Sequence, residues 1–155
     1  MCIRDRYYML DEKEIRKLPK AELHCHLDGS VRTATIRDLA KKCGAKLPTE
    51  DLAELEKYVR VTETCRSLTE FLACFNFFYD FLKSPEAVER SAYELCEDAA
   101  RENVRYIEVR FAPPLQTTDK FSADEVVRCA LRGLDQGSRD FNTVSYTHLT
   151  LPTKR

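Results

Sequence analysis

The segment Ala21-Glu-Leu-His-Cys-His-Leu-Asp-Gly-Ser30 places two histidines and an aspartate at alternate positions. In a β-strand successive side chains point to opposite faces, so this spacing predicts one polar face and one apolar face. The polar face would carry Glu22, His24, His26 and Asp28, and the apolar face Leu23, Cys25 and Leu27. Such a strand suits a parallel barrel, in which helices cover the apolar face and reactive groups gather at the carboxyl end of each strand.

The histidine pair is compatible with two interpretations. Two neutral imidazoles on one strand face, one strand repeat apart, can bind a single divalent metal ion. A bare His-x-His is also common as an ordinary pair of polar residues without a metal. Spacing alone therefore leaves the role of His24 and His26 open.

A longer string around the pair has a known counterpart. Leu18-Pro-Lys-Ala-Glu-Leu-His-Cys-His-Leu-Asp-Gly-Ser30 resembles the first-strand signature of the adenosine deaminase family, a group of metal-dependent amidohydrolases. Arg105-Tyr-Ile-Glu-Val-Arg-Phe-Ala-Pro113 resembles the second barrel strand of that family. The resemblance extends over residues 12–142.

This resemblance implies a metal site and a ligand. It implies one Zn²⁺ per site, with His24 and His26 as metal ligands. It also implies that His26 and Asp28 lie against the ribose of a bound purine nucleoside. For the complete protein the implied reaction is zinc-dependent hydrolytic deamination of adenosine, and of 2′-deoxyadenosine, yielding inosine from adenosine, with release of ammonia, in purine salvage.

The implied reaction needs a proton donor and a base in addition to a zinc-activated water. In the family the third histidine, the glutamate acid and the metal-binding aspartate lie downstream of the resembling region, so no catalytic acid or base is assigned within this chain. Thr147-His-Leu-Thr150 does not match the family's string for the third histidine, and His148 is not assigned as a ligand.

Composition favours a small neutral partner. The chain has 25 basic and 26 acidic residues, which gives no basic footprint for nucleic acid or for an anionic membrane surface. No apolar run approaches the ~20 residues that span a bilayer. Seven cysteines at irregular spacing argue against a disulfide framework, and we expect a cytoplasmic protein. The H-x-E and P-C-x-x-C pattern of the deaminases that act on nucleic acids is absent.

Length limits the predicted fold. A complete (β/α)₈ TIM barrel takes about 250 residues, whereas this chain has 155. We therefore predict an α/β fold, the truncated N-terminal part of such a barrel, with about two barrel strands and several helices. Apolar spacing indicates helices over 33–43, 48–58, 67–82, 84–100 and 122–134 and a second alternating strand over 106–111.

The two ends do not continue this pattern. Residues 7–142 form the predicted portion of a deaminase barrel, whereas residues 1–6 and 143–155 resemble translated sequencing-adapter read-through and are interpreted as non-native. The alternation of Ser and Thr in the tail leaves a third barrel strand as the other interpretation.

The helix predicted over 67–82 has an unusually aromatic face. Periodicity alone favours a core stripe. The family resemblance instead implies an apolar lid over the purine, which would exclude water from the zinc site. The lid residues would be Leu68, Phe71, Leu72 and Phe75.

Three alternatives stay open at the level of sequence. A related adenine or AMP deaminase is one, although Asp28 favours a nucleoside because its carboxylate would repel a phosphate. The chain could instead be an inactive fragment or a weak two-histidine metal-binding module, since two barrel strands leave sheet edges unpaired.

Glu108 and Arg110, on the polar face of the second strand, are interpreted as an internal ion pair rather than as catalytic groups.

Overall fold

A three-stranded parallel sheet is the centre of the computed structural model, which describes residues 11–60 and 65–147. Its strands are β1 (Lys20–His26), β2 (Val104–Arg110) and β3 (Val144–Thr147), in the order β1-β2-β3. Helices connect the strands, as expected for the opening of a parallel α/β barrel. The predicted fold class is confirmed.

The third strand adds to the two that the sequence predicted. β3 pairs with β2 in parallel, with Val144 opposite Tyr106. The alternation of Ser and Thr in this segment is therefore that of a strand, the interpretation that was left open. The native or foreign origin of residues 1–6 and 143–155 stays a prediction. Residues 1–10 and 148–155, including His148, lie outside the described residues.

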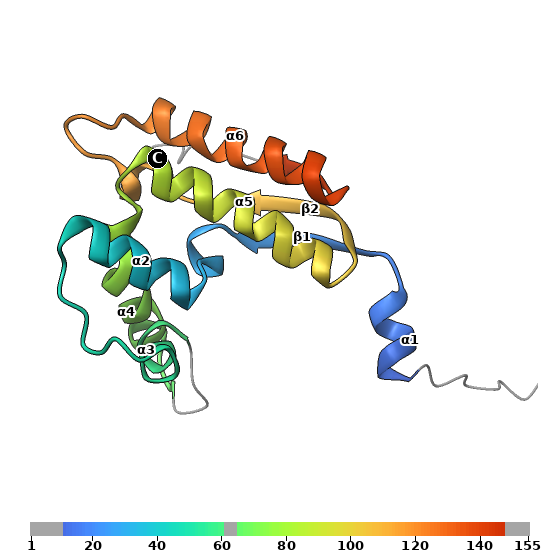
Figure 1. The fold of residues 1–155 in the computed structure, drawn as a ribbon, viewed down its shortest axis with the longest axis horizontal. Coiled ribbons are helices and arrows are strands. Elements are labelled where there is room, and N and C mark those ends of the chain that lie inside the picture. Colours follow the sequence, from blue (N-terminus) through green and yellow to red (C-terminus); the bar gives the residue numbers. More distant parts are fainter. Residues whose placement is uncertain (1–10, 61–64, 148–155) are drawn as a thin grey trace, which may run out of the picture.

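Two long helices cover one face of the sheet (Figure 1). They are α5 (Pro85–Arg101) and α6 (Ala123–Phe141). Ser84 accepts a hydrogen bond from the Ala87 amide and Ser122 forms a capping box with Glu125, so both helices begin where the sequence predicted. The main core between helices and sheet consists of Leu27, Val88, Ala92, Leu95, Cys96, Ala99, Val104, Ile107, Val109, Phe121, Val126, Cys129, Ala130 and Leu134.

The remaining helices form a second group at the carboxyl end of β1, apart from the short α1 (Figure 1). Arg32 joins this group to α5, because its guanidinium contacts Asp98 at 2.6 Å and Glu97 at 2.7 Å. The elements are α1 (Glu12–Lys17), α2 (Thr33–Cys43), α3 (Leu52–Val59), α4 (Leu68–Phe78) and three short 3₁₀ helices, η1 (Asp28–Ser30), η2 (Tyr79–Leu82) and η3 (Pro113–Gln116). No helix within residues 11–60 and 65–147 is both long enough and apolar enough to cross a bilayer.

Helices α5 and α6 approach closely because α6 has glycines four residues apart. A Cβ atom on Gly133 would lie 2.8 Å from the Ala92 Cβ and would overlap the Glu89 carbonyl oxygen. A Cβ atom on Gly137 would lie 2.5 Å from the Cys96 Cβ. The absence of a side chain at these two positions thus sets the separation of the helices.

Substitution of Gly133 by alanine is expected to destabilise the chain. The new methyl group would meet backbone rather than a flexible side chain, so the overlap should cost about 1–3 kcal/mol and exceed the gain in helix propensity. Thermal unfolding followed by circular dichroism should show a midpoint several degrees lower. Gln136→Ala, at an exposed position of the same helix, is the control. An unchanged midpoint for Gly133→Ala would contradict the close approach.

Candidate active site

Strand β1 brings the two histidine rings together at its carboxyl end. The Nε2 atoms of His24 and His26 are 3.3 Å apart, and the ring centroids are 5.2 Å apart. Two nitrogen ligands of a tetrahedral zinc ion, each bonded at about 2.0–2.1 Å, are separated by about 3.3 Å. The pair therefore fits two positions of a tetrahedral metal site. Among the described residues no cluster of three or more His, Cys, Asp or Glu side chains joins them.

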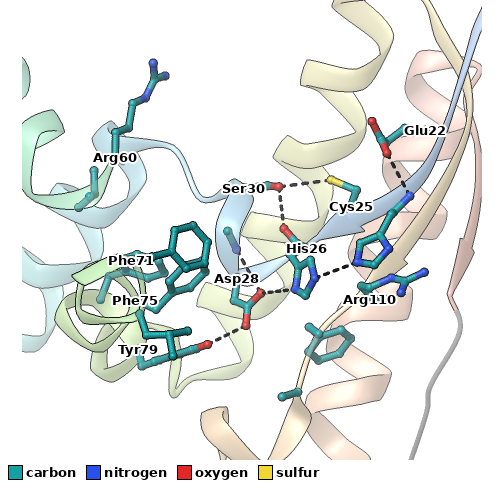
Figure 2. A pocket seen from close by; sticks show the side chains of 17 residues that line it. Glu22, Cys25, His26, Asp28, Ser30, Arg60, Phe71, Phe75, Tyr79 and Arg110 are labelled. Carbon is teal, nitrogen blue, oxygen red and sulfur yellow. Dashed lines mark hydrogen bonds and ion pairs between the residues drawn. The ribbon is translucent and has the colours of Figure 1, made fainter. Parts of the chain in front are cut away.

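Asp28 lies two residues beyond the end of β1, at the start of η1, and is 4% exposed. Its Oδ1 atom accepts a hydrogen bond from the Gly29 amide at 3.1 Å and lies 3.6 Å from Nδ1 of His26. A carboxylate beside Nδ1 favours a proton there, which leaves Nε2 of the same ring free to bind a metal. The structure thus brings together the three residues that the resemblance selected, and Figure 2 shows His26 beside Asp28.

Tyr79 is a site residue that the sequence did not single out. It begins η2, and its hydroxyl donates a hydrogen bond of 2.9 Å to Oδ2 of Asp28. Burial, and then the nearby carboxylate, raise the pKa of the Tyr79 phenol above its usual range. The phenol is therefore neutral and a donor at neutral pH. Helical periodicity had indicated only an apolar position, and no local pattern reveals a contact across 51 residues.

A cavity of about 700 Å³ opens beside these groups. Phe71, Leu72 and Phe75 of α4 line it opposite the histidines, whereas Leu68 does not line it and is 71% exposed. Three of the four predicted lid residues therefore face the cavity. A Cβ atom built on Gly29 would lie 3.5 Å from the Phe75 ring, an ordinary van der Waals distance, so this ring packs close to the turn after β1.

Arg110, at the end of β2, also lines the cavity. It pairs in register with His26, and its guanidinium donates to the Leu23 carbonyl at 3.4 Å. Its Nε atom is buried without a hydrogen-bond partner among the described residues. Within the part of the chain that the structure describes, the predicted ion pair between Arg110 and Glu108 does not form, and Glu108 instead accepts a hydrogen bond of 3.1 Å from the Tyr106 hydroxyl.

Curated proteins that match most of this chain are adenosine deaminases. Adenosine deaminase from Vibrio atlanticus is 46% identical over 125 residues, which are 81% of this chain and 37% of that protein. Adenosine deaminase from Enterococcus faecalis is 42% identical over 136 residues, 88% of this chain and 40% of that protein. The chain thus spans less than half the length of these relatives.

Solved structures agree with the fold. Adenine deaminase from Arthrobacter aurescens superposes with a TM-score of 0.72 at 26% identity, over 83% of this chain and 38% of that one. An amidohydrolase from Burkholderia ambifaria with bound Zn superposes with a TM-score of 0.71 at 28% identity, over 92% of this chain and 39% of that one. An Arabidopsis protein named ADAL, in complex with GMP, superposes with a TM-score of 0.65 at 31% identity, over 82% of this chain and 37% of that one.

The sequence model of one family spans most of the chain. The model described as "Adenosine deaminase" matches residues 19–151, a range that includes all three strands and the histidine pair. This chain belongs to the adenosine deaminase family.

Proposed function

We propose that this chain is the amino-terminal part of a zinc-dependent hydrolase that deaminates adenosine, and 2′-deoxyadenosine, with release of ammonia in purine salvage. The observation that carries the proposal is the convergence of His24, His26 and Asp28 on one cavity beneath an aromatic helix. Membership of the family and the zinc-bound relative from Burkholderia ambifaria support it.

Two imidazoles of β1 would hold the metal. His24 and His26 would bind it through Nε2, with the remaining ligands supplied by parts of the protein outside the described residues. When bound, zinc lowers the pKa of a coordinated water toward about 7 and so supplies a nucleophile at neutral pH. The Asp28 carboxylate would keep the His26 ring oriented through Nδ1.

Asp28 would also select the class of substrate. Each carboxylate oxygen can accept about two hydrogen bonds, so Oδ1 and Oδ2 retain capacity for a ribose hydroxyl beside their contacts with Gly29 and Tyr79. A phosphate at the same place would be repelled by the buried carboxylate. Asp28 therefore favours a nucleoside over a nucleotide, although a related protein binds GMP.

Helix α4 would cover the purine. The rings of Phe71 and Phe75 are 5.2 Å apart and both line the cavity. An apolar cover of this kind excludes water and strengthens the electrostatic interactions beneath it.

A second candidate applies to the 155-residue chain by itself. The described residues supply only two converging imidazoles, and the sheet edges at β1 and β3 are unpaired in the same residues. We therefore expect the isolated chain to act at most as a weak metal-binding module without deaminase activity.

A hybrid enzyme tests the main proposal. In it, residues 11–142 of this chain replace the matching segment of Vibrio atlanticus adenosine deaminase. We expect the hybrid to convert adenosine to inosine in preference to AMP or adenine, and Asp28→Asn to reduce that preference. His24→Ala should lower turnover by at least about two orders of magnitude. Faster conversion of AMP or adenine than of adenosine would contradict the proposal.

Zinc binding can be measured on the 155-residue chain itself. Competition with a chromophoric chelator should give one weakly bound Zn²⁺ per chain, because only two nitrogen ligands converge. His24→Ala and His26→Ala should each abolish binding. His148→Ala is the matched control, since the sequence does not assign His148 as a ligand, and equal losses in all three variants would show that the pair is not the site.

The role of the aromatic cover is tested within one helix. Phe71→Ala in the hybrid should raise KM for adenosine several-fold, because the ring lines the cavity. Leu68→Ala, three residues earlier and outside the cavity lining, should leave KM unchanged. If both variants behave alike, α4 contributes core packing rather than substrate contact.

A further inference from the structure

The two oxygens of the Asp28 carboxylate are held by different parts of the fold. Oδ1 faces the end of β1, through the Gly29 amide at 3.1 Å and Nδ1 of His26 at 3.6 Å. Oδ2 accepts a hydrogen bond of 2.9 Å from Tyr79, which follows helix α4 (Figure 2). The carboxylate therefore bridges the histidine strand and the aromatic segment.

The Tyr79 ring belongs to the same aromatic cluster that faces the cavity. Its centroid lies 6.2 Å from that of Phe75 and 5.9 Å from that of Phe78. Phe75 in turn lies 5.2 Å from Phe71. The phenol hydroxyl thus sits at the end of a continuous row of ring contacts along α4, and its position depends on where that helix lies.

A buried carboxylate loses much of its stabilisation when one donor is removed. Asp28 is 4% exposed, so water does not readily replace a missing hydrogen bond. The Gly29 amide and His26 constrain only one of the two oxygens. The donor from Tyr79 holds the other oxygen, and because a carboxylate is planar, the contacts at both oxygens together fix its rotation about the Cβ–Cγ bond.

We propose that Tyr79 is a positioning residue whose hydroxyl orients Asp28 and couples that orientation to the placement of α4 over the cavity. The inference rests on the proposed function, in which Asp28 receives a ribose hydroxyl. Helix α4, in its place over the cavity, then presents Asp28 through Tyr79 in the orientation that accepts the ribose hydroxyl. Tyr79 itself acts through Asp28.

The test compares two ligands in the hybrid enzyme. Tyr79→Phe removes the hydroxyl and keeps the ring. We expect KM for adenosine to rise about tenfold, as for loss of a hydrogen bond to a charged group, with kcat changed less than about twofold. The inhibition constant of 9-methyladenine, which has no ribose hydroxyl, should stay the same, because only the carboxylate's orientation is lost.

Tyr93→Phe is the matched control. The Tyr93 hydroxyl donates to Oδ2 of Asp140 at 3.1 Å and its ring lies 5.3 Å from that of Phe141, so the change is chemically equivalent and lies between α5 and α6. It should leave both constants unchanged. An unchanged KM in Tyr79→Phe, or equal weakening of adenosine and 9-methyladenine, would overturn the proposal.

A spectroscopic measurement separates this proposal from the proposed function. If the unsubstituted hybrid does not deaminate adenosine, the proposed function fails, and the Tyr79–Asp28 contact is then tested in the 155-residue chain. Subtracting the tyrosinate absorbance of Tyr79→Phe from that of the unsubstituted chain isolates the titration of Tyr79. We expect Asp28→Asn to shift the titration of Tyr79 toward lower pH, because the nearby carboxylate raises the pKa of the phenol. If Asp28→Asn does not move this titration, Tyr79 and Asp28 are not coupled.

Discussion

The parallel pairing of β1 with β2 is the interaction on which the other features of this structure depend. It places His26 beside Arg110 and Cys25 beside Val109, and so fixes which face of β1 meets the core. Because side chains alternate along a strand, the packing of Cys25 against the main core on one face directs His24 and His26 to the other. A slip of one residue would exchange the two faces and turn the imidazoles toward α5 and α6. The approach of the two imidazoles is thus a consequence of packing on the opposite side of the sheet.

Much of this arrangement could be predicted from local pattern. The alternation of polar and apolar residues predicted strands β1 and β2, and the serine N-caps predicted where α5 and α6 begin. Contacts between distant segments could not be predicted in the same way. The hydrogen bond from Tyr79 to Asp28 spans 51 residues, and periodicity assigned Tyr79 to an apolar face. The ion pair expected for Glu108 and Arg110 failed for a similar reason, because neighbours on one strand face compete for partners that a single sequence does not rank.

The aromatic segment shows why the core and lid interpretations were difficult to separate. Phe78 is 4% exposed and belongs to the smaller core with Ile36 and Leu39, yet it also lines the cavity, as the more exposed Phe71 does from the same helix. One amphipathic stripe therefore serves both purposes over successive turns. The buried end anchors the helix, and the exposed end is free to contact a ligand. Tyr79 lies next to the anchored end, which suits a residue that must hold a carboxylate in place.

Within the described residues, both the sheet and the proposed metal site are incomplete. On β1 and β3 the apolar side chains of Leu23 and Tyr146 are 58% and 51% exposed, and three strands enclose only part of a barrel. The histidine pair likewise supplies two of the four positions that a tetrahedral zinc ion requires. Any segment that continued the sheet would cover the exposed side chains and bring its own inward-facing groups toward the histidines. Barrel closure would then raise stability and metal affinity together, since both depend on the same strands pairing.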